Sequence, residues 1–221
     1  MTALAGGLLI FAWFGATPNV SATVPPTPTV DDILGRMVAA RKDLNSYSVP
    51  VHFDIGIQKP ISVTLPLDGV RYFERPDKEA LVMQSVPAIA QAFQRTYAGL
   101  GTAETWPQRY DLSVVAPDRT ASATIYELKG IPKNGGNVAY ILIDVARDLA
   151  VPVRARWFYR DGATIDMAIE NALAGNGYLL PKTETLDIVF PSYVGHTVAH
   201  YGDYAINLPI PASVWESSPP P

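Results

Sequence analysis

The chain has 221 residues, of which 48% are hydrophobic and 17% charged, and its formal net charge is −4. These values exclude a generally disordered chain and fit one domain with a sizeable core, and without a polybasic run nucleic-acid binding has no electrostatic basis. The absence of cysteine excludes disulfides, thiolate metal sites and cysteine nucleophiles.

The N-terminal segment is typical of an export signal. Residues 4–16 form an apolar run of 13 residues, whereas a helix needs about 20 to cross a bilayer. Val20, Ser21 and Ala22 then match a signal-peptidase site, so we expect cleavage after Ala22. No Lys or Arg precedes the run, which keeps an uncleaved membrane anchor as the alternative. The expected organisation is a signal peptide at 1–22, a Pro-rich spacer at 23–29, one domain at 30–215 and a disordered tail at 216–221.

The domain is expected to begin with a helix and to continue with a series of strands. Thr29 is a candidate N-cap, and apolar residues at helical spacing predict a helix that ends near Asn45. From Val49 the apolar period changes to two, which predicts a half-buried strand of about ten residues. A second helix is expected at 87–100, with Pro87 in its first turn. Further strands are expected at 61–65, 70–74, 80–84, 110–115, 121–129, 138–144, 153–159, 165–172, 179–189, 197–201 and 204–208.

One hairpin, at 153–170, can be predicted at the level of its register. A two-residue loop at Asp161 and Gly162 would pair Phe158 with Ile165 and set arginines beside apolar residues. A three-residue loop, in which Gly162 is left-handed, instead pairs Trp157 with Ile165, Ala155 with Met167 and Val153 with Ile169, and sets Arg156 opposite Asp166. We choose the second register because it sorts the residues into one apolar and one charged face. Roughly a dozen such strands with short turns predict one curved antiparallel sheet, whose apolar side the two helices cover.

The sequence contains no arrangement of residues that predicts catalysis. The GxSxG, P-loop, GxGxxG and HExxH patterns are absent. His196 and His200 lie in a strand-like run, where four residues span about 13 Å, too far for two ligands of one ion. His52 lies on the polar side of its strand. We therefore expect no metal, no cofactor and no enzymatic activity.

Two features are more unusual than the rest. Arg75, followed by Pro76, ends a strand; if Gly69 closes a three-residue loop, Arg75 shares the apolar phase of Phe73 and needs a partner there. The alternative is an arginine that extends to solvent at the sheet rim. The second feature is the supply of aromatic residues, because helices over a curved sheet can leave an apolar hollow between the layers. The candidates for lining such a hollow are Val51, Phe53, Ile55, Phe73, Phe93, Trp157, Ile165 and Met167.

The order of several short motifs resembles the LolA-like superfamily of outer-membrane lipoprotein carriers and lipoprotein-sorting proteins. These motifs are VHFDIGI at 51–57, YFERPDK at 72–78, YELKGIPK at 126–133, YILID at 140–144, PVRARWFYRDG at 152–162, GYLLPKTE at 177–184 and YAINLPIPASVW at 204–215. The resemblance implies an α+β fold: an incomplete antiparallel β-barrel of about 11–12 strands, covered on its concave apolar face by two or more helices. It also implies that the hollow shelters acyl chains. The family's strand-end Arg-Pro matches Arg75-Pro76, and that arginine helps to hold the helical lid shut.

The favoured hypothesis is an exported, non-catalytic carrier that binds acyl chains of lipids or lipoproteins between sheet and helices. Its expected partners are those lipids or lipoproteins and membrane-associated donor or acceptor proteins, and not nucleic acid; we expect a monomer in the periplasm or elsewhere outside the cytoplasm. A second hypothesis is a sensing or regulatory module of the same fold that docks a membrane protein, and a third is an enzyme of unrecognised type.

Overall fold

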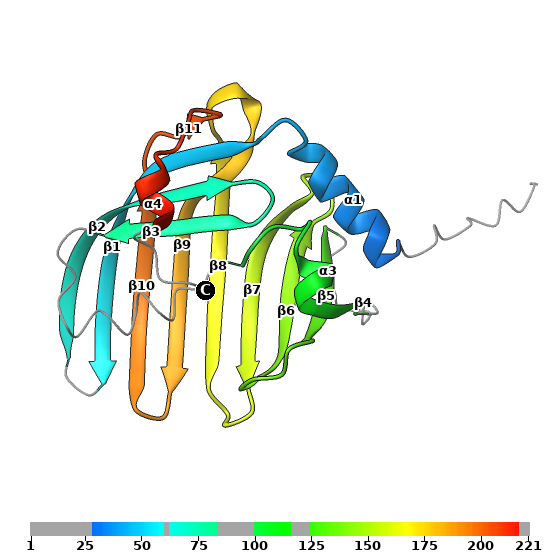
Figure 1. The fold of residues 1–221 in the computed structure, drawn as a ribbon. Coiled ribbons are helices and arrows are strands. Elements are labelled where there is room, and N and C mark those ends of the chain that lie inside the picture. Colours follow the sequence, from blue (N-terminus) through cyan, green and yellow to red (C-terminus); the bar gives the residue numbers. More distant parts are fainter. Residues whose placement is uncertain (1–27, 60–61, 84–99, 116–123, 217–221) are drawn as a thin grey trace, which may run out of the picture.

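The computed structural model describes residues 28–59, 62–83, 100–115 and 124–216, which form one open antiparallel sheet with few helices (Figure 1). The spatial order of the 11-stranded sheet is β3-β2-β1-β10-β9-β8-β7-β6-β5-β4, and β11 pairs with β1. The edge strands β3 and β4 do not pair with each other, so the predicted incomplete barrel is confirmed. The strands are β1 (Ser46–Lys59), β2 (Val63–Glu74), β3 (Lys78–Met83), β4 (Tyr110–Val114), β5 (Ile125–Pro132), β6 (Val138–Ala146), β7 (Val151–Tyr159), β8 (Thr164–Leu173), β9 (Leu179–Phe190), β10 (Tyr193–Tyr201) and β11 (Ala205–Ile206).

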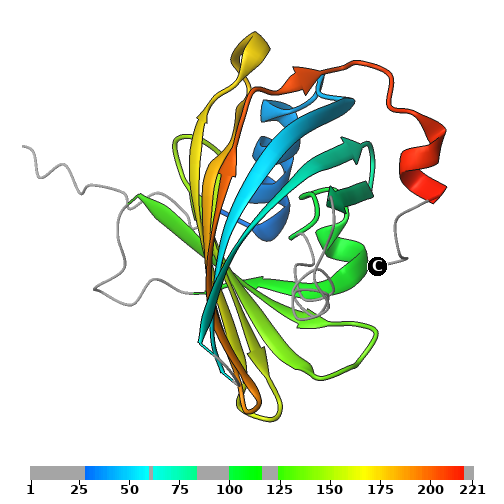
Figure 2. The same cartoon turned by 90° about the vertical axis from the view of Figure 1, so that its left-hand side faces the viewer.

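The helices α1 (Val30–Ala40) and α3 (Trp106–Arg109) lie on the concave side of the sheet (Figure 2). The 3₁₀ turn η2 (Gly175–Gly177) joins β8 to β9, and α4 (Ala212–Glu216) follows β11 and packs beside β3. Neither α3 nor α4 was expected from the sequence. The expected helix at 87–100 lies outside the described residues except for Leu100, and so does the expected signal peptide.

The first helix forms as its sequence predicts but ends earlier. The Thr29 hydroxyl accepts a hydrogen bond from the Asp32 backbone N–H, and the Asp32 carboxylate accepts one from the Thr29 backbone N–H, which completes a capping box. Ile33, Leu34 and Met37 form its buried face. The helix ends at Ala40 rather than near Asn45, because the backbone N–H groups of 41 and 42 bond to carbonyls three residues earlier and tighten the chain into a turn.

Strand β2 differs from the expected pair of short strands at 61–65 and 70–74. It is continuous from Val63 to Glu74, and Gly69 pairs with Val51 on one side and Met83 on the other instead of closing a turn. A Cβ atom at Gly69 would lie 2.9 Å from the carbonyl oxygen of Val82. The glycine therefore permits close approach of two strands, a role that resembles a turn signal when only the sequence is known.

The β7–β8 hairpin confirms the register chosen from the sequence. Trp157 pairs with Ile165, Ala155 with Met167, and Arg156 is opposite Asp166. Gly162 has a positive φ of 84°, as the three-residue loop requires. Asp166 nevertheless forms its ion pair with the diagonal neighbour Arg154.

The two faces of the sheet differ sharply in polarity. The concave face carries the core, in which Val49, Phe53, Ile55, Ile143 and Ala155 are fully buried. The outer face carries ion pairs, such as the one between Arg156 and Glu127, whose atoms are 2.5 Å apart. His52, His196 and His200 lie on strands, with side chains 44%, 47% and 54% exposed. The described part of the chain contains no helix of the length and apolarity that a membrane crossing demands.

Candidate functional site

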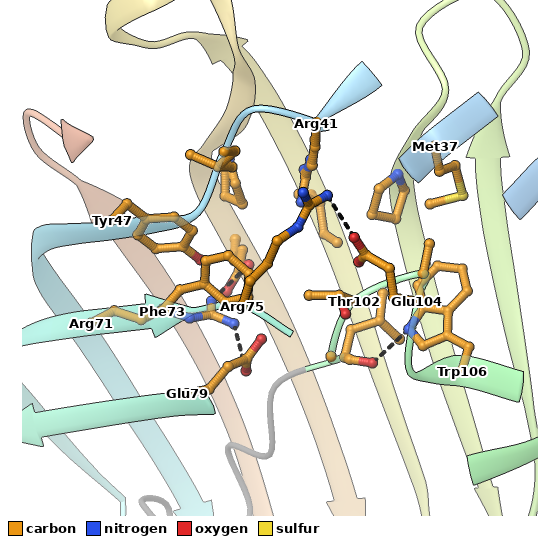
Figure 3. Close-up of a pocket in the computed structure, with 18 of the residues that line it drawn as sticks. Met37, Arg41, Tyr47, Arg71, Phe73, Arg75, Glu79, Thr102, Glu104 and Trp106 are labelled. Atoms are coloured by element: carbon orange, nitrogen blue, oxygen red, sulfur yellow. Dashed lines mark hydrogen bonds and ion pairs between the residues drawn. The ribbon is translucent and has the colours of Figure 1, made fainter. Parts of the chain in front are cut away.

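A pocket opens on the concave side of the sheet, between the end of α1, the segment 100–106 and the strands β2, β8 and β9 (Figure 3). We call it the inner pocket. Its volume is about 70 Å³, which is room for a few water molecules. Its apolar lining comes from both layers and includes Met37, Leu44, Phe73, Trp106, Met167 and Ile169.

The apolar part of the lining is well packed. Phe73 and Met167 are 4% and 5% exposed, so little of either side chain reaches solvent. The ring of Phe73 stacks on Tyr47 with centroids 5.2 Å apart. Trp106 begins α3 and is fully buried, and its indole N–H donates to the carbonyl oxygen of Leu100 at 2.9 Å. The Phe73–Tyr47 stack thus supports the sheet side of the pocket, and the bond from Trp106 to Leu100 joins the two ends of the segment 100–106.

Arg75 attaches the segment 100–106 to the end of β2. Its guanidinium donates to Oε1 of Glu104 at 2.6 Å and to the carbonyl oxygen of Lys42 at 2.5 Å. The side chains of Arg75 and Glu104 are only 24% and 28% exposed, so solvent screens this ion pair incompletely. The hydroxyl of Thr102 also donates to the carbonyl oxygen of Pro76 at 3.1 Å. We call the ion pair of Arg75 and Glu104 the latch.

A second charged cluster lies deeper, where β2, β3, β9 and β10 contribute one residue each. Arg71 lies 3.5 Å from Glu79 and 3.4 Å from Glu184, and it donates to the Tyr201 hydroxyl at 2.8 Å. That hydroxyl in turn donates to Glu184 at 2.6 Å. Burial alone lowers the pKa of Arg71, but the surrounding Tyr201, Tyr47, Glu184 and Glu79 raise it well above its ordinary value. The guanidinium is thus held in its charged form inside the fold.

Arg41 is the third arginine of the pocket lining. It is the C-cap residue of α1, and its side chain is half-buried. Its guanidinium donates to the carbonyl oxygen of Leu179 at 3.2 Å. Burial lowers the pKa of Arg41, partly offset by the nearby Tyr47, Tyr204 and Glu104.

The residues predicted from the sequence as cavity lining fall into three groups. Phe73, Met167 and the proposed gate Arg75 lie in the inner pocket lining. Trp157 is partly buried against the core, and Phe93 lies outside the described residues. The others are buried in the core and do not line this pocket: Val51, Phe53, Ile55 and Ile165.

Sequence reasoning missed most of the polar lining of the pocket. Arg71 shares the strand phase of Phe73, which was a visible signal for an inward-facing charge. Glu184 likewise shares its phase in β9 with the buried Leu186 and Ile188. Glu104 lies in a segment without periodicity, and no sequence signal pointed to it.

Comparisons with known proteins identify the fold. No protein-family model matches the sequence, and a search of curated proteins gives no match. A DUF1329 family protein from Desulfovibrio piger has a TM-score of 0.62 and 14% identity, covering 85% of this chain and 96% of that one. A putative outer membrane lipoprotein-sorting protein domain from Vibrio parahaemolyticus has a TM-score of 0.60 and 10% identity, covering 84% and 94%.

A third solved structure is a LolA superfamily protein from Nitrosomonas europaea. Its TM-score is 0.54 and its identity 13%, and the match covers 86% of this chain and 98% of that one. At these identities the likeness shows the fold alone. The chain therefore has a LolA-like fold, as its motifs led us to expect.

Proposed function

We propose that this protein is an exported, non-catalytic carrier that binds the acyl chain of a lipid or lipoprotein in the inner pocket. The observation that carries the proposal is an apolar wall of sheet residues under a segment held to the end of β2 by one charged side chain. The LolA-like fold, shared with a putative outer membrane lipoprotein-sorting domain, supports it as an analogy of fold.

The energetics of acyl chains explain why such a carrier is useful. Each CH₂ group of an acyl chain exposed to water costs about 0.8 kcal/mol, so a 16-carbon chain costs roughly 12 kcal/mol. A lipid that crosses an aqueous space needs a protein surface that replaces the membrane. Side chains such as Phe73, Met167 and Ile169, which belong to one hydrophobic cluster and line the pocket, supply that surface.

The present size of the pocket implies that it must widen to accept a ligand. Ligand pockets in proteins commonly measure about 300–1,000 Å³, whereas the volume here is about 70 Å³. The segment 100–106 is the part of the lining that the latch holds in place. We propose that Arg75 gates the pocket, because release of Glu104 would free this segment from the end of β2.

The polar groups of the pocket favour binding over chemistry. Glu79 and Glu184 are engaged with Arg71, and Glu104 is engaged with Arg75. These contacts hold charges in place and do not pair a nucleophile with a base. Export is a separate part of the proposal, and the segment predicted to direct it is 1–22. The intact mass of the protein recovered from the periplasm tests this part, because cleavage after Ala22 would leave Thr23 as the N-terminal residue.

Native mass spectrometry of the purified full chain tests the proposal. We expect copurified lipid on the wild-type protein and its loss in Ile169→Asp, which places a charge on the apolar wall. Leu173→Asp is the matched control, because Leu173 is on the same strand but 74% exposed. A wild-type protein without lipid that also fails to bind added palmitate would contradict the proposal, and capture of a membrane protein alone would favour the regulatory hypothesis.

A further inference from the structure

The charges that line the inner pocket do not pair one to one. Three arginines and three glutamates contribute to the lining. Glu79 and Glu184 both lie against Arg71, and Glu104 lies against Arg75. Among the residues that the structure describes, no carboxylate oxygen lies within 4.0 Å of the Arg41 guanidinium.

Within the described part of the chain, Arg41 therefore keeps unused hydrogen-bonding capacity inside the pocket. A guanidinium has five N–H donors, and the bond to the Leu179 carbonyl oxygen at 3.2 Å uses one of them. Figure 3 shows Arg41 at the top of the pocket, with its side chain directed down toward the other lining residues. A half-buried cation of this kind is stabilised when an anion accepts hydrogen bonds from its free N–H groups.

The position of Arg41 also suits a ligand with two chemically different ends. The residue follows α1 directly, and Met37, one turn earlier on the same helix, belongs to the apolar lining. Phe73, Met167 and Ile169 continue the apolar surface on the sheet side. A charged hydrogen-bond donor thus lies next to an apolar surface, which is the arrangement that binds an amphiphile.

We infer that the inner pocket selects amphiphiles with an anionic headgroup, a carboxylate or a phosphate, and that Arg41 binds that headgroup. The inference rests on the proposed carrier function and adds the charge class of the cargo. The planar guanidinium can donate two parallel hydrogen bonds to either anion. A neutral headgroup leaves those donors unused, and a cationic headgroup is repelled.

The other charged groups around Arg41 are consistent with this role. Glu104 is a carboxylate whose charge raises the pKa of Arg41, and it forms an ion pair with Arg75 at 2.6 Å. Arg71 faces Arg41 from the sheet and adds positive potential, while Tyr47 and Tyr204 are neutral phenols because burial raises the pKa of each. The three arginines and three glutamates of the described lining balance in charge before the ligand enters, and the anion adds the acidic partner that Arg41 does not have among the described residues.

Competition binding with ligands of equal chain length tests the inference. The full chain is titrated, at physiological salt and below micellar concentrations, with palmitate, palmitoyl lysophosphatidate, hexadecanol and hexadecyltrimethylammonium, each displacing a fluorescent fatty acid. We expect the two anions to bind about tenfold more tightly than hexadecanol, as a charge-assisted hydrogen bond contributes, and the cation to bind most weakly. A preference for palmitate alone identifies a carboxylate as the headgroup that the pocket binds, and a preference for palmitoyl lysophosphatidate alone identifies a phosphate.

Variants of Arg41 separate headgroup binding from pocket integrity. Arg41→Gln should bring the anions to within about twofold of hexadecanol while hexadecanol affinity stays unchanged, and Arg41→Lys should restore part of the preference. Arg36→Gln is the matched control, since Arg36 is exposed on the same helix and lies over the Tyr126 ring at 5.2 Å. Equal binding of anions and hexadecanol by the wild type, or an anion preference that survives Arg41→Gln, overturns the inference and leaves the carrier proposal standing. Failure of every 16-carbon ligand to bind overturns the carrier proposal itself.

Discussion

The latch between Arg75 and Glu104 gives a quantitative prediction about ligand exchange. We consider Glu104→Gln, which removes the charge of the acceptor and keeps its size, and Arg75→Met, which also removes the bond to the carbonyl oxygen of Lys42. Arg75 directly follows β2, and Glu104 lies in the turn before α3, so neither change removes a residue of the sheet and the fold should survive each one. The segment 100–106, however, should detach more often.

The magnitude follows from the partial burial of the pair. Fully exposed ion pairs contribute about 0.2–1 kcal/mol, whereas removal of one partner of a buried pair costs about 3–5 kcal/mol. With exposures of 24% and 28% and an N–O distance of 2.6 Å, the latch lies between these limits. We take about 1.5 kcal/mol, which corresponds to roughly a tenfold larger open population.

Stopped-flow fluorescence with a fluorescent fatty acid measures this effect. If ligands enter and leave through the open state, Glu104→Gln should raise both the association and the dissociation rate about tenfold and leave Kd nearly unchanged. Arg75→Met should raise them at least as much, and the double variant should behave like Arg75→Met alone, because the pair is already broken.

A control on the outer face distinguishes gating from general loss of charge. Arg154→Met breaks the ion pair of Arg154 with Asp166, whose side chains are 46% and 35% exposed on the face opposite the pocket. It should leave both rates unchanged. Rates in Glu104→Gln and Arg75→Met that equal those of the wild type would refute the gating role of the latch.

Three further predictions concern stability and protonation. Glu184→Gln removes the negative charge on β9 that lies beside the buried Arg71 and should lower the free energy of unfolding by about 3 kcal/mol. A loss below about 1 kcal/mol in urea titration would contradict the structural role of the cluster. The hydrogen bond to Asp68 raises the pKa of His52 above its ordinary value of 6.5. This contact therefore stabilises the fold fully below pH 6.5, and its contribution is lost as the pH rises through the pKa of the folded state. Asp68→Asn should return the pKa of His52, measured by NMR, toward 6.5, and an unchanged pKa would exclude this cause. Gly130→Ala would place a Cβ 2.9 Å from the Ile141 side chain and should lower Tm through overpacking worth about 1–3 kcal/mol, whereas an unchanged Tm would show that the neighbouring side chains yield without cost.

Local rules were enough to predict the elements whose signals lie close together in the sequence. The β7–β8 register followed from sorting two faces across a loop with a left-handed Gly162, and the structure has that register. The start of α1 followed from the capping residue Thr29. The interpretation failed at Gly69, because a glycine that permits close strand approach and a glycine that permits a turn look alike in a sequence.

The polar part of the candidate site depends on contacts between residues far apart in the chain. Arg71 meets Glu184 across 113 residues, and Arg75 meets Glu104 across 29. Alternation in β2 could indicate that Arg71, Phe73 and Arg75 share one face. It could not indicate which carboxylates reach them, because strand order and the path of the segment 100–106 are properties of the folded chain.

The central claim is that an acyl chain lies against the residues of the inner pocket, and the methionine methyl groups report on this directly. The chain has four methionines, of which Met37 and Met167 line the pocket and Met83 does not. The full chain is labelled with ¹³C at its methionine methyl groups and bound to palmitate that is not deuterated. We then predict intermolecular NOEs from the acyl methylenes to Met37 and Met167 and none to Met83. Bound palmitate that gives NOEs to Met83 alone, or to no methionine, would contradict the account.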